Sequence, residues 1–529
     1  MRGDRGVRGA INDALRWWVS ASVRAWGAAL RAVFRVRLNR FSAHQRGLRA
    51  RYGIEERTPV LRHSAERSVL QGAVARTSGS SGMPKEIPYP AKRVRMVKAM
   101  YMDAFCRAFS AFGVRRTSLY VFSATRNDDS LTSLMMKESR PLPPYFSTLQ
   151  APYRVHSNPD LLGLEDRYGV DAVRMWVIAL SNPGCTYATN PSTIALFAEG
   201  VALNWAERSS LVRDWSNAPA RFSRAVHRIA KRIDSLGSSA RIARIAQSTE
   251  AMALLEWWPG LRWLCCWDGG YVRVYLDRVR VHMPESRVNH LPMYSMSTET
   301  VETRPLFADG GVFFVPVVPD VLVEFLPVDS DDDPMSLVQI DDLEEGEEYT
   351  MVVSDQWGLK RYQTEDVFSV FRRVNGLPDL RFERRRGLAF SFTGEKLTGD
   401  QAADALRSLR DRVPPLKASP WLVLVPSSVP HPHYKLVVTD AKDGGVLEGI
   451  EAALDEALGQ VNSEYADKRR SSRLGMPEAV AMPFSEALTR VGGQSPDRSW
   501  QTQFKFLPLA AVTWEAMNLR NHSGDSGSS

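Results

Sequence analysis

The sequence predicts an α/β protein made of a large multilayer domain with a small β-barrel-like subdomain, followed by a smaller α+β domain. Three observations predict this fold class. A chain of 529 residues is longer than one hydrophobic core usually organises. Helical and strand patterns alternate between Ala91 and Trp267, as in layered α/β proteins. From Gly311 the chain turns to short β-rich runs, and beyond Gly394 to a compact α+β tail.

The domain boundaries are placed where these patterns change. The first predicted domain is residues 1–390, with a basic helical N-terminus over 1–50 and a β-rich subdomain at about 305–380. The second predicted domain is residues 391–529.

The elements of the first domain follow from hydrophobic periodicity and length. The segment Val170–Leu180 is apolar throughout, so periodicity leaves it open as a strand or a short helix. The other expected elements are helices at Ala91–Phe112, Pro191–Glu207, Ala218–Leu236 and Ser239–Glu256, and strands at Val114–Ala124 and Leu261–Trp267.

The β-rich region and the tail are assigned in the same way. The β-runs are Val312–Pro316, Val321–Leu326, Glu348–Val353 and Val367–Arg373. The tail predicts helices at Asp400–Val413 and Leu447–Tyr465, and strands at Trp421–Pro426 and His433–Thr439.

The composition is that of a globular protein, with 44% hydrophobic and 24% charged residues. The four cysteines form no C-x-x-C pair, which predicts a reducing, cytoplasmic location and no structural zinc. A net charge of +8 is modest for this length, and no nucleic-acid-binding module is present, so we expect no nucleic-acid partner.

Much of the positive charge lies at the N-terminus, where nine arginines of residues 1–40 face only Asp4 and Asp13. Between Ile11 and Val36 these arginines alternate with Trp17, Trp18, Trp26, Leu30 and Phe34. The pattern indicates an amphipathic helix that either rests on an anionic membrane surface or packs its aromatic face on the main body. Packing is the favoured interpretation, and arginine recurs too often for a membrane span.

A loop of small residues is the strongest local signal for chemistry. It reads Thr77-Ser-Gly-Ser-Ser-Gly-Met-Pro-Lys85. Small residues leave backbone N–H groups and hydroxyls free to surround a polyphosphate, and a lysine adds positive charge. A flexible linker has the same composition, and the spacing is not that of a Walker A motif.

Later segments match one known family in the right order. They are Tyr294-Ser-Met-Ser-Thr-Glu299, Glu324-Phe-Leu-Pro327, Gly358-Leu-Lys-Arg-Tyr-Gln-Thr-Glu-Asp366, Phe382-Glu-Arg-Arg-Arg386, Phe392-Thr-Gly-Glu-Lys396 and Gln503-Phe-Lys505. Together with the loop, they resemble the Gretchen Hagen-type acyl acid amido synthetases, a branch of the adenylate-forming enzymes. The resemblance spans about Ala75 to Leu509. In the third segment, Gln363 and Glu365 stand where the family has arginine and glycine.

The resemblance implies an activity and a set of substrates. The enzyme would activate a carboxylic acid with ATP and Mg²⁺ as an acyl-adenylate, and then transfer the acyl group to an amine or amino acid. A mobile C-terminal cap would rotate between the two steps. Two alternatives stay open: an adenylate-forming ligase that delivers the acyl group to coenzyme A or a carrier thiol, and a non-catalytic basic protein that binds membrane or nucleic acid.

The resemblance also implies roles for particular residues. The catalytic residues would be Lys505, Lys396 and Glu299, and Glu299 would also bind the magnesium ion. The carboxylic acid would contact Ser192, Thr193 and Phe197. The nucleotide and its phosphates would contact Thr77, Ser78, Gly79, Ser80, Ser81, Gly82, Lys85, Tyr294, Ser297, Thr298, Arg361, Tyr362 and Asp366, with Asp366 on the ribose hydroxyls.

Overall fold

A computed structural model describes most of the chain. The described residues are 3–61, 73–76, 86–122, 131, 134–135, 159–233, 239–269, 273–293, 296–328, 330, 332–386, 389–390, 392, 395, 397–440, 449–492 and 506–517.

A parallel sheet lies inside the N-terminal part, with its strands paired in the order β3-β4-β5-β6. Its two faces meet different cores. Cys185 and Cys265 belong to the core that includes α3, whereas Tyr120 and Leu264 belong to the core of the helical layer. Because both faces are covered, β3 and β5 are apolar runs, and the one polar side chain of β4, Thr186, is buried and donates to the Tyr120 carbonyl at 3.3 Å. The strands are β3 (Leu119–Val121), β4 (Cys185–Tyr187), β5 (Trp263–Cys266) and β6 (Asn289–Pro292).

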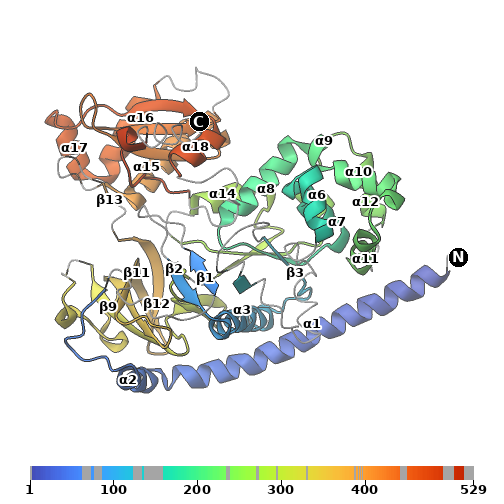
Figure 1. The fold of residues 1–529 in the computed structure, drawn as a ribbon, viewed down its shortest axis with the longest axis horizontal. Helices are drawn as coiled ribbons and strands as arrows, with labels where there is room; N and C mark the ends of the chain where they lie inside the picture. Colours follow the sequence, from blue (N-terminus) through green and yellow to red (C-terminus); the bar gives the residue numbers. More distant parts are fainter. Residues whose placement is uncertain are drawn as a thin grey trace, which may run out of the picture.

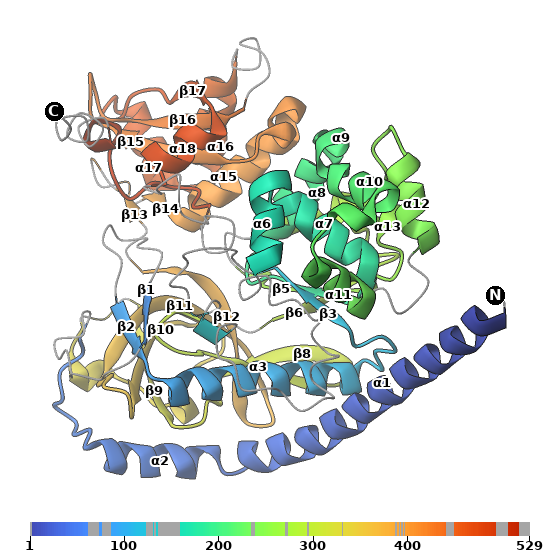
Figure 2. The same ribbon diagram turned by 45° about the vertical axis from the view of Figure 1, so that its right-hand side comes forward.

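A layer of helices covers one side of this sheet, and α3 with α1 lies on the other (Figure 2). The segment that sequence periodicity left open is helical: α7 (Val170–Ser181) is buried from Ala172 to Leu180. A helix buried on all sides is apolar all round, which explains why it shows no amphipathic period. The layer consists of α6 (Pro159–Tyr168), α7, α8 (Pro191–Leu203), α9 (Trp205–Arg208), α10 (Ser210–Asn217), α11 (Arg224–Ile233), α12 (Ser239–Gln247), α13 (Leu254–Trp257), α14 (Arg273–His282) and the 3-10 turn η2 (Pro219–Arg221).

The N-terminal helices run along one edge of the molecule (Figure 1). The long α1 packs against α3 at Gly27, where an added Cβ would lie 1.9 Å from the backbone oxygen of Cys106. Only glycine permits this approach of the two helices. The elements are α1 (Gly3–Leu38), α2 (Phe41–Tyr52), β1 (Ala73–Arg76), β2 (Glu86–Tyr89) and α3 (Ala91–Ala111).

The aromatic residues of α1 divide between its two sides. Phe34 is buried, with the guanidinium carbons of Arg107 and Arg304 at 4.1 and 4.7 Å from its ring centroid. The tryptophans Trp17, Trp18 and Trp26 are 68%, 54% and 54% exposed. The expectation that the aromatic face packs on the main body therefore holds for Phe34 and is wrong for the three tryptophans. None of the described helices is both long and apolar enough to cross a lipid bilayer.

The β-rich region contains a four-stranded antiparallel sheet in the order β12-β11-β10-β9 and a separate hairpin of β7 and β8 that packs against β12. Three of the predicted β-runs lie within longer strands, and the run Val312–Pro316 corresponds to β8, which ends at Val315. The elements are β7 (Arg304–Ala308), β8 (Gly311–Val315), β9 (Val321–Pro327), β10 (Glu348–Asp355), β11 (Tyr362–Val374), β12 (Leu377–Arg385) and the 3-10 turns η4 (Pro334–Ser336) and η5 (Ile340–Asp342).

The C-terminal elements form a separate body with a core of its own (Figure 1). A second core of this body also includes Tyr275 of α14. The predicted helix at 447–465 is interrupted at Asn462, because the Asn462 side chain caps α17 by accepting from the Tyr465 backbone N–H at 2.7 Å. The elements are β13 (Ala389–Phe390), β14 (Leu397–Thr398), α15 (Gly399–Arg412), η6 (Pro414–Ala418), β15 (Leu422–Ser427), β16 (His433–Thr439), α16 (Ile450–Val461), α17 (Ser463–Arg470), β17 (Glu478–Met482) and α18 (Phe484–Arg490). The boundary at residue 390 stays a prediction.

Candidate active site

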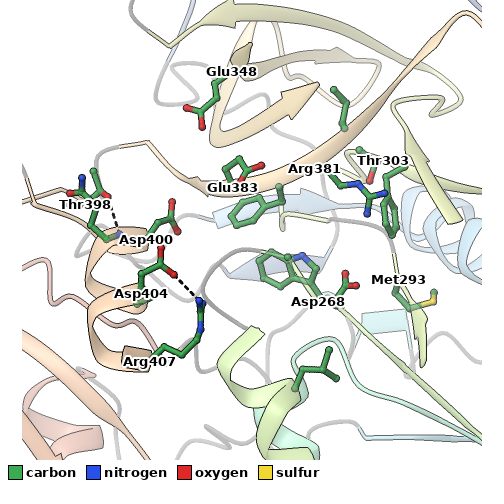
Figure 3. Close-up of a pocket in the computed structure, with 18 residues that line it drawn as sticks. Asp268, Met293, Thr303, Glu348, Arg381, Glu383, Thr398, Asp400, Asp404 and Arg407 are labelled. Atoms are coloured by element: carbon green, nitrogen blue, oxygen red, sulfur yellow. Dashed lines mark hydrogen bonds and ion pairs between the residues drawn. The ribbon is translucent and has the colours of Figure 1, made fainter. Parts of the chain in front are cut away.

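The carboxyl ends of the parallel strands open onto a cleft. In open α/β sheets this end of the sheet is the usual ligand-binding edge. The cleft has a volume of about 810 Å³ and is lined by Trp267 and Asp268 after β5, Met293 after β6, Phe382 on β12 and Asp400 on α15. It therefore lies between the sheet, the β-rich region and the C-terminal body, as Figure 3 shows.

The segment from Met296 to Thr300 folds into a tight turn beside the sheet. Met296 and Val301 form a β-bridge, and the Thr300 N–H donates to Ser297 Oγ at 3.3 Å. The Thr298 carbonyl accepts a hydrogen bond from the Tyr89 hydroxyl at 2.8 Å. Tyr89 ends β2, the strand that follows the predicted phosphate loop, so this contact joins the end of β2 away from the loop to the turn.

Glu299 lies inside this turn and is 1% exposed. Its Oε1 accepts from the Tyr362 hydroxyl at 3.3 Å, whereas no described residue donates to its second oxygen. Two segments predicted from separate motifs, 294–299 and 358–366, are thus in direct contact.

Arg93 in α3 joins the turn to its surroundings. Its guanidinium donates to the Glu299 carbonyl at 2.6 Å, to the Pro88 carbonyl at 2.9 Å and to Asp355 Oδ2 at 3.0 Å. It also lies 4.4 Å from the centroid of the Tyr89 ring. Arg93 is 3% exposed, so these contacts are made almost without water.

Burial changes the acidity of two groups beside Arg93. Burial raises the pKa of the Tyr89 hydroxyl to about 12, although the Arg93 charge acts in the opposite direction. Burial also raises the pKa of the Asp355 carboxyl, and here too the Arg93 charge opposes the shift. The Tyr89 hydroxyl therefore stays protonated at neutral pH and acts as a donor to the turn.

Arg361 makes a buried ion pair instead of facing an open site. Its Nε and one terminal nitrogen donate to the two oxygens of Glu324, each at 3.0 Å. Its other terminal nitrogen donates to the carbonyls of Glu56 and Thr58, each at 2.7 Å. All three nitrogens are occupied and the residue is 2% exposed. This geometry favours a positioning role, in which Arg361 fixes the neighbouring Tyr362. It does not favour the direct nucleotide contact that was expected from the sequence.

Asp366 lies in a bulge of β11. Residues 364–366 stand opposite Met351 alone, because Gln363 pairs with Val352 and Val367 with Thr350. Asp366 is 5% exposed, and in the described ranges no side chain bonds to its carboxylate. Its carboxylate is therefore open to a ligand that donates hydrogen bonds.

The bulge also gives a physical reason why the family has glycine at the position of Glu365. Glu365 has φ = +66°, in the left-handed region that glycine occupies without steric cost. Here a glutamate adopts that conformation, and Asp366 keeps its place in the strand, opposite Arg385.

The predicted acid-binding residues lie at the start of α8, just after β4. Asn190 caps this helix by accepting from the Ser192 N–H at 3.0 Å, and Thr193 follows in the first turn. Phe197 is 1% exposed, and its ring packs against Phe122 and Trp257 with centroids at 5.1 and 6.2 Å. Ser192 and Thr193 thus lie at the ligand-binding edge, whereas Phe197 is a residue of the helical core.

The cysteines are poor nucleophiles. All four are free and buried, and burial raises the pKa of the Cys265 and Cys266 thiols well above the ordinary value. Reactive cysteines are instead partly exposed and carry a lowered pKa.

Several predicted residues lie outside the described residues: Thr77, Ser78, Gly79, Ser80, Ser81, Gly82, Lys85, Tyr294, Lys396 and Lys505. Their roles stay predictions. The strands on either side of the loop, β1 and β2, pair antiparallel with Arg76 opposite Glu86.

Sequence reasoning missed Tyr89, Arg93, Asp355 and the residues of the cleft. Asp355 has a local signal, because it precedes a turn in which its Oδ1 accepts from the Trp357 and Leu359 N–H groups at 2.7 and 3.1 Å. Arg93 has none, since it reads as one basic residue among several in a helix.

Comparisons with known proteins agree with this architecture. The model of the GH3 family N-terminal domain matches residues 72–288, and that of the GH3 family central domain matches residues 314–385; together they cover more than half of the chain. The solved structure of AtGH3.15 acyl acid amido synthetase in complex with 2,4-DB has a TM-score of 0.65 and 16% sequence identity, over 92% of this chain and 86% of that one. At this identity the likeness concerns the fold.

Curated relatives match over shorter segments. Indole-3-acetic acid-amido synthetase GH3.4 of Arabidopsis thaliana is 30% identical over 149 residues, which are 26% of this chain and 24% of that protein. Indole-3-acetic acid-amido synthetase GH3.8 of Oryza sativa subsp. indica is 38% identical over 98 residues, which are 18% of this chain and 16% of that protein. The chain therefore spans a quarter or less of the length of these relatives.

Proposed function

Because the chain belongs to the GH3 family of acyl acid amido synthetases, we propose that it activates a carboxylic acid with ATP and transfers the acyl group to an amine. In the first step a carboxylate oxygen attacks the α-phosphorus of ATP, and pyrophosphate leaves. In the second step the amine attacks the acyl carbon of the mixed anhydride, AMP leaves, and the amine loses a proton.

The observation that carries the proposal is the contact between the motif segments. Tyr362 bonds to the Glu299 carboxylate, and Arg93 bonds to the Glu299 carbonyl. Tyr89, at the end of the strand that follows the predicted phosphate loop, bonds to Thr298 in the same turn. The strand that follows the predicted phosphate loop, the turn with the proposed metal ligand Glu299 and the strand with the proposed ribose ligand Asp366 are thus connected by hydrogen bonds.

In this proposal, each part of the nucleotide has its own residues. The loop from Thr77 to Lys85 would surround the phosphates, with Ser297 and Thr298 beside it, and Tyr294 would lie along the adenine. Asp366 would accept hydrogen bonds from the ribose hydroxyls, which would satisfy its buried carboxylate. A lysine of the C-terminal domain, Lys505 or Lys396, would neutralise the α-phosphate.

The residues around Glu299 fit a magnesium ion. Magnesium is commonly held by one or two carboxylates together with substrate phosphates. Glu299 offers a buried carboxylate with one oxygen that no described residue bonds, and no group of three or more potential ligands occurs in the described part of the chain. When bound, the ion would supply positive charge to the departing pyrophosphate.

The carboxylic acid and the amine would meet at the edge of the sheet. Ser192 and Thr193 lie at the N-terminus of α8, whose dipole favours a carboxylate, while their own backbone N–H groups bond to Asn190. The cleft of about 810 Å³ at the carboxyl ends of β5 and β6 has the size of a small-molecule site and is bordered by α15 of the C-terminal body. Rotation of that body would change the cleft between the two steps.

The test is the variant Asp366→Asn, assayed for acid-dependent pyrophosphate release from ATP over a panel of carboxylic acids. Loss of the charged acceptor should raise the KM for ATP at least about tenfold. Glu347→Gln is the matched control, because Glu347 is an exposed carboxylate of the same β-rich region.

A KM for ATP that is unchanged in Asp366→Asn would remove the ribose assignment. The acceptor is tested with the wild-type protein. AMP release with amines and without any thiol supports the proposal, whereas a strict requirement for coenzyme A or a carrier thiol contradicts it.

A further inference from the structure

The outer face of α1 has no part in the proposed reaction. α1 buries one side against the body, where Val23 and Phe34 are each 3% exposed. The opposite side carries large apolar side chains in contact with solvent. They are Trp17, Trp18 and Trp26, at 68%, 54% and 54% exposure, and Val33 and Val36, at 50% and 55%.

These residues are spread over the exposed half of the helix, with Trp17 and Trp26, nine residues apart, on its opposite margins. In a helix of 3.6 residues per turn, Trp18, Ala25, Ala29 and Val36 fall on the same face, opposite Phe34. The alanines between the larger residues are exposed as well. We call Trp17, Trp18, Ala25, Trp26, Ala29, Ala32, Val33 and Val36 the outer face of α1.

The charge beside this face has one sign. Residues 17–40 contain five arginines, Arg24, Arg31, Arg35, Arg37 and Arg40, and no aspartate or glutamate. Arg35, Arg37 and Arg40 are exposed, and α2 adds the exposed Arg46, whereas Arg51 of α2 is paired with Asp320 at 3.6 Å.

The outer face lies at the edge of the molecule. Figures 1 and 2 show α1 and α2 following each other along this edge, with α3 on the inner side of α1 and the N-terminal end of α1 projecting past the body. A flat surface can therefore approach the whole length of the outer face.

We propose that the outer face of α1 binds a membrane surface rich in anionic lipid. Tryptophan rings are stable at the level of the lipid headgroups, and the flanking arginines would pair with lipid phosphates. A second copy of the chain is the less favourable occupant, because two such faces would bring arginines against arginines with no acidic residue of residues 17–40 between them. This inference does not depend on the proposed enzymatic function.

The test is flotation of the full-length protein with lipid vesicles. One set contains phosphatidylcholine alone, and the other contains equal parts of phosphatidylcholine and phosphatidylglycerol. The bound fraction should be at least about tenfold higher on the anionic vesicles, and added salt should lower it. Equal binding to both sets, or no binding to either, would overturn the proposal.

Two sets of variants separate the apolar and the charged contributions. The first variant combines Trp17→Ser, Trp18→Ser and Trp26→Ser. The second variant combines Arg35→Gln, Arg37→Gln and Arg40→Gln. Each variant should bind anionic vesicles at least about tenfold less than the wild type. Leu203→Ser with Val281→Ser is the matched control, because these residues are 73% and 79% exposed on other helices. That control should bind like the wild type.

Circular dichroism and the midpoint of urea unfolding establish that each variant is folded. Sedimentation equilibrium tests the competing occupant. If the wild type is a dimer and the tryptophan variant a monomer, the outer face is a contact between copies and the membrane proposal fails. The proposal also fails if the folded tryptophan variant floats with anionic vesicles as well as the wild type does.

Discussion

Arg93 brings together three segments that are distant in the sequence. It bonds to Pro88, to the Glu299 carbonyl and to the Asp355 carboxylate, and its plane lies over the Tyr89 ring. A guanidinium can make all these contacts at once because it is planar and carries several fixed donors, whereas a lysine ammonium is a compact point charge. Arg93 therefore sets the position of Glu299 relative to the strand beside the predicted phosphate loop.

We predict that Arg93→Lys lowers kcat for acid-dependent pyrophosphate release by about tenfold to a hundredfold. A lysine cannot keep both the Glu299 and the Asp355 contacts, and a displacement of about 1 Å at a reacting group can cost about a hundredfold. The rate is measured at saturating ATP. Arg115→Lys, at an exposed position, is the control and should keep the wild-type rate. A wild-type kcat in Arg93→Lys would contradict the positioning role.

Arg361 and Asp366 show how differently two charged residues of one motif are used. The Arg361 guanidinium is held by Glu324 and by two backbone carbonyls, so it supports the chain before Tyr362. The Asp366 carboxylate is buried and bonded by no described side chain, so it is the better candidate for a ligand contact. The motif alone did not separate these two roles.

At the scale of elements, the contact between α1 and α3 depends on a backbone approach. A Cβ at Gly27 would lie 1.9 Å from the Cys106 oxygen and 2.9 Å from Ser110 Cβ. Contacts beside the crossing fix the helix further, since Arg24 donates to the Val114 carbonyl at 3.0 Å and Ser20 Oγ lies 3.3 Å from Thr117 Oγ1. This packing holds the outer face of α1 toward solvent.

We predict that Gly27→Ala lowers the free energy of unfolding by about 1–3 kcal/mol, because the new methyl group overlaps backbone and overpacking costs about that much. Helix propensity alone would favour alanine by about 1 kcal/mol, so the sign of the change shows which effect dominates. The measurement is urea unfolding followed by circular dichroism.

Gly47→Ala in α2 is the matched control for this prediction. No atom lies within 4 Å of its added Cβ, so alanine should raise the free energy of unfolding by up to about 1 kcal/mol. If both variants are stabilised, α1 does not pack on α3 as described.

At the scale of the molecule, the candidate site is shared among parts that have separate cores. The turn at Glu299 and the strand with Asp366 belong to the N-terminal part, and neither residue lines the cleft, which is bordered on one side by α15 of the C-terminal body. A nucleotide that contacts several parts would stabilise their native arrangement, because it binds the folded chain and not the unfolded one.

We predict that MgATP at about 100 times its Kd raises the free energy of unfolding by about 2.7 kcal/mol. Differential scanning calorimetry with and without MgATP measures the effect as a rise in the unfolding temperature. The rise should persist in Glu347→Gln and shrink in Asp366→Asn. If millimolar MgATP leaves the wild-type transition unchanged, the chain has no nucleotide site of useful affinity.

Local signals in the sequence were sufficient for the main architecture. Strand patterns, small-residue loops and helix lengths are properties of short segments, so they predicted the layered body, the β-rich region and the α+β tail. The uniformly apolar segment of α7 stayed open, because a helix buried on all sides has no amphipathic period. The order of the motifs predicted the family, which the matches to its N-terminal and central domains support.

Only the tertiary structure decided which side chains meet. Arg93 contacts Glu299 and Asp355 across 206 and 262 positions of sequence, and no local pattern records such a contact. The same holds for the tryptophans of α1, whose helical pattern favoured a packed aromatic face although the structure exposes all three. Their exposure was determined by the place where Gly27 lets α1 approach α3, because that crossing selects which side of the helix is covered.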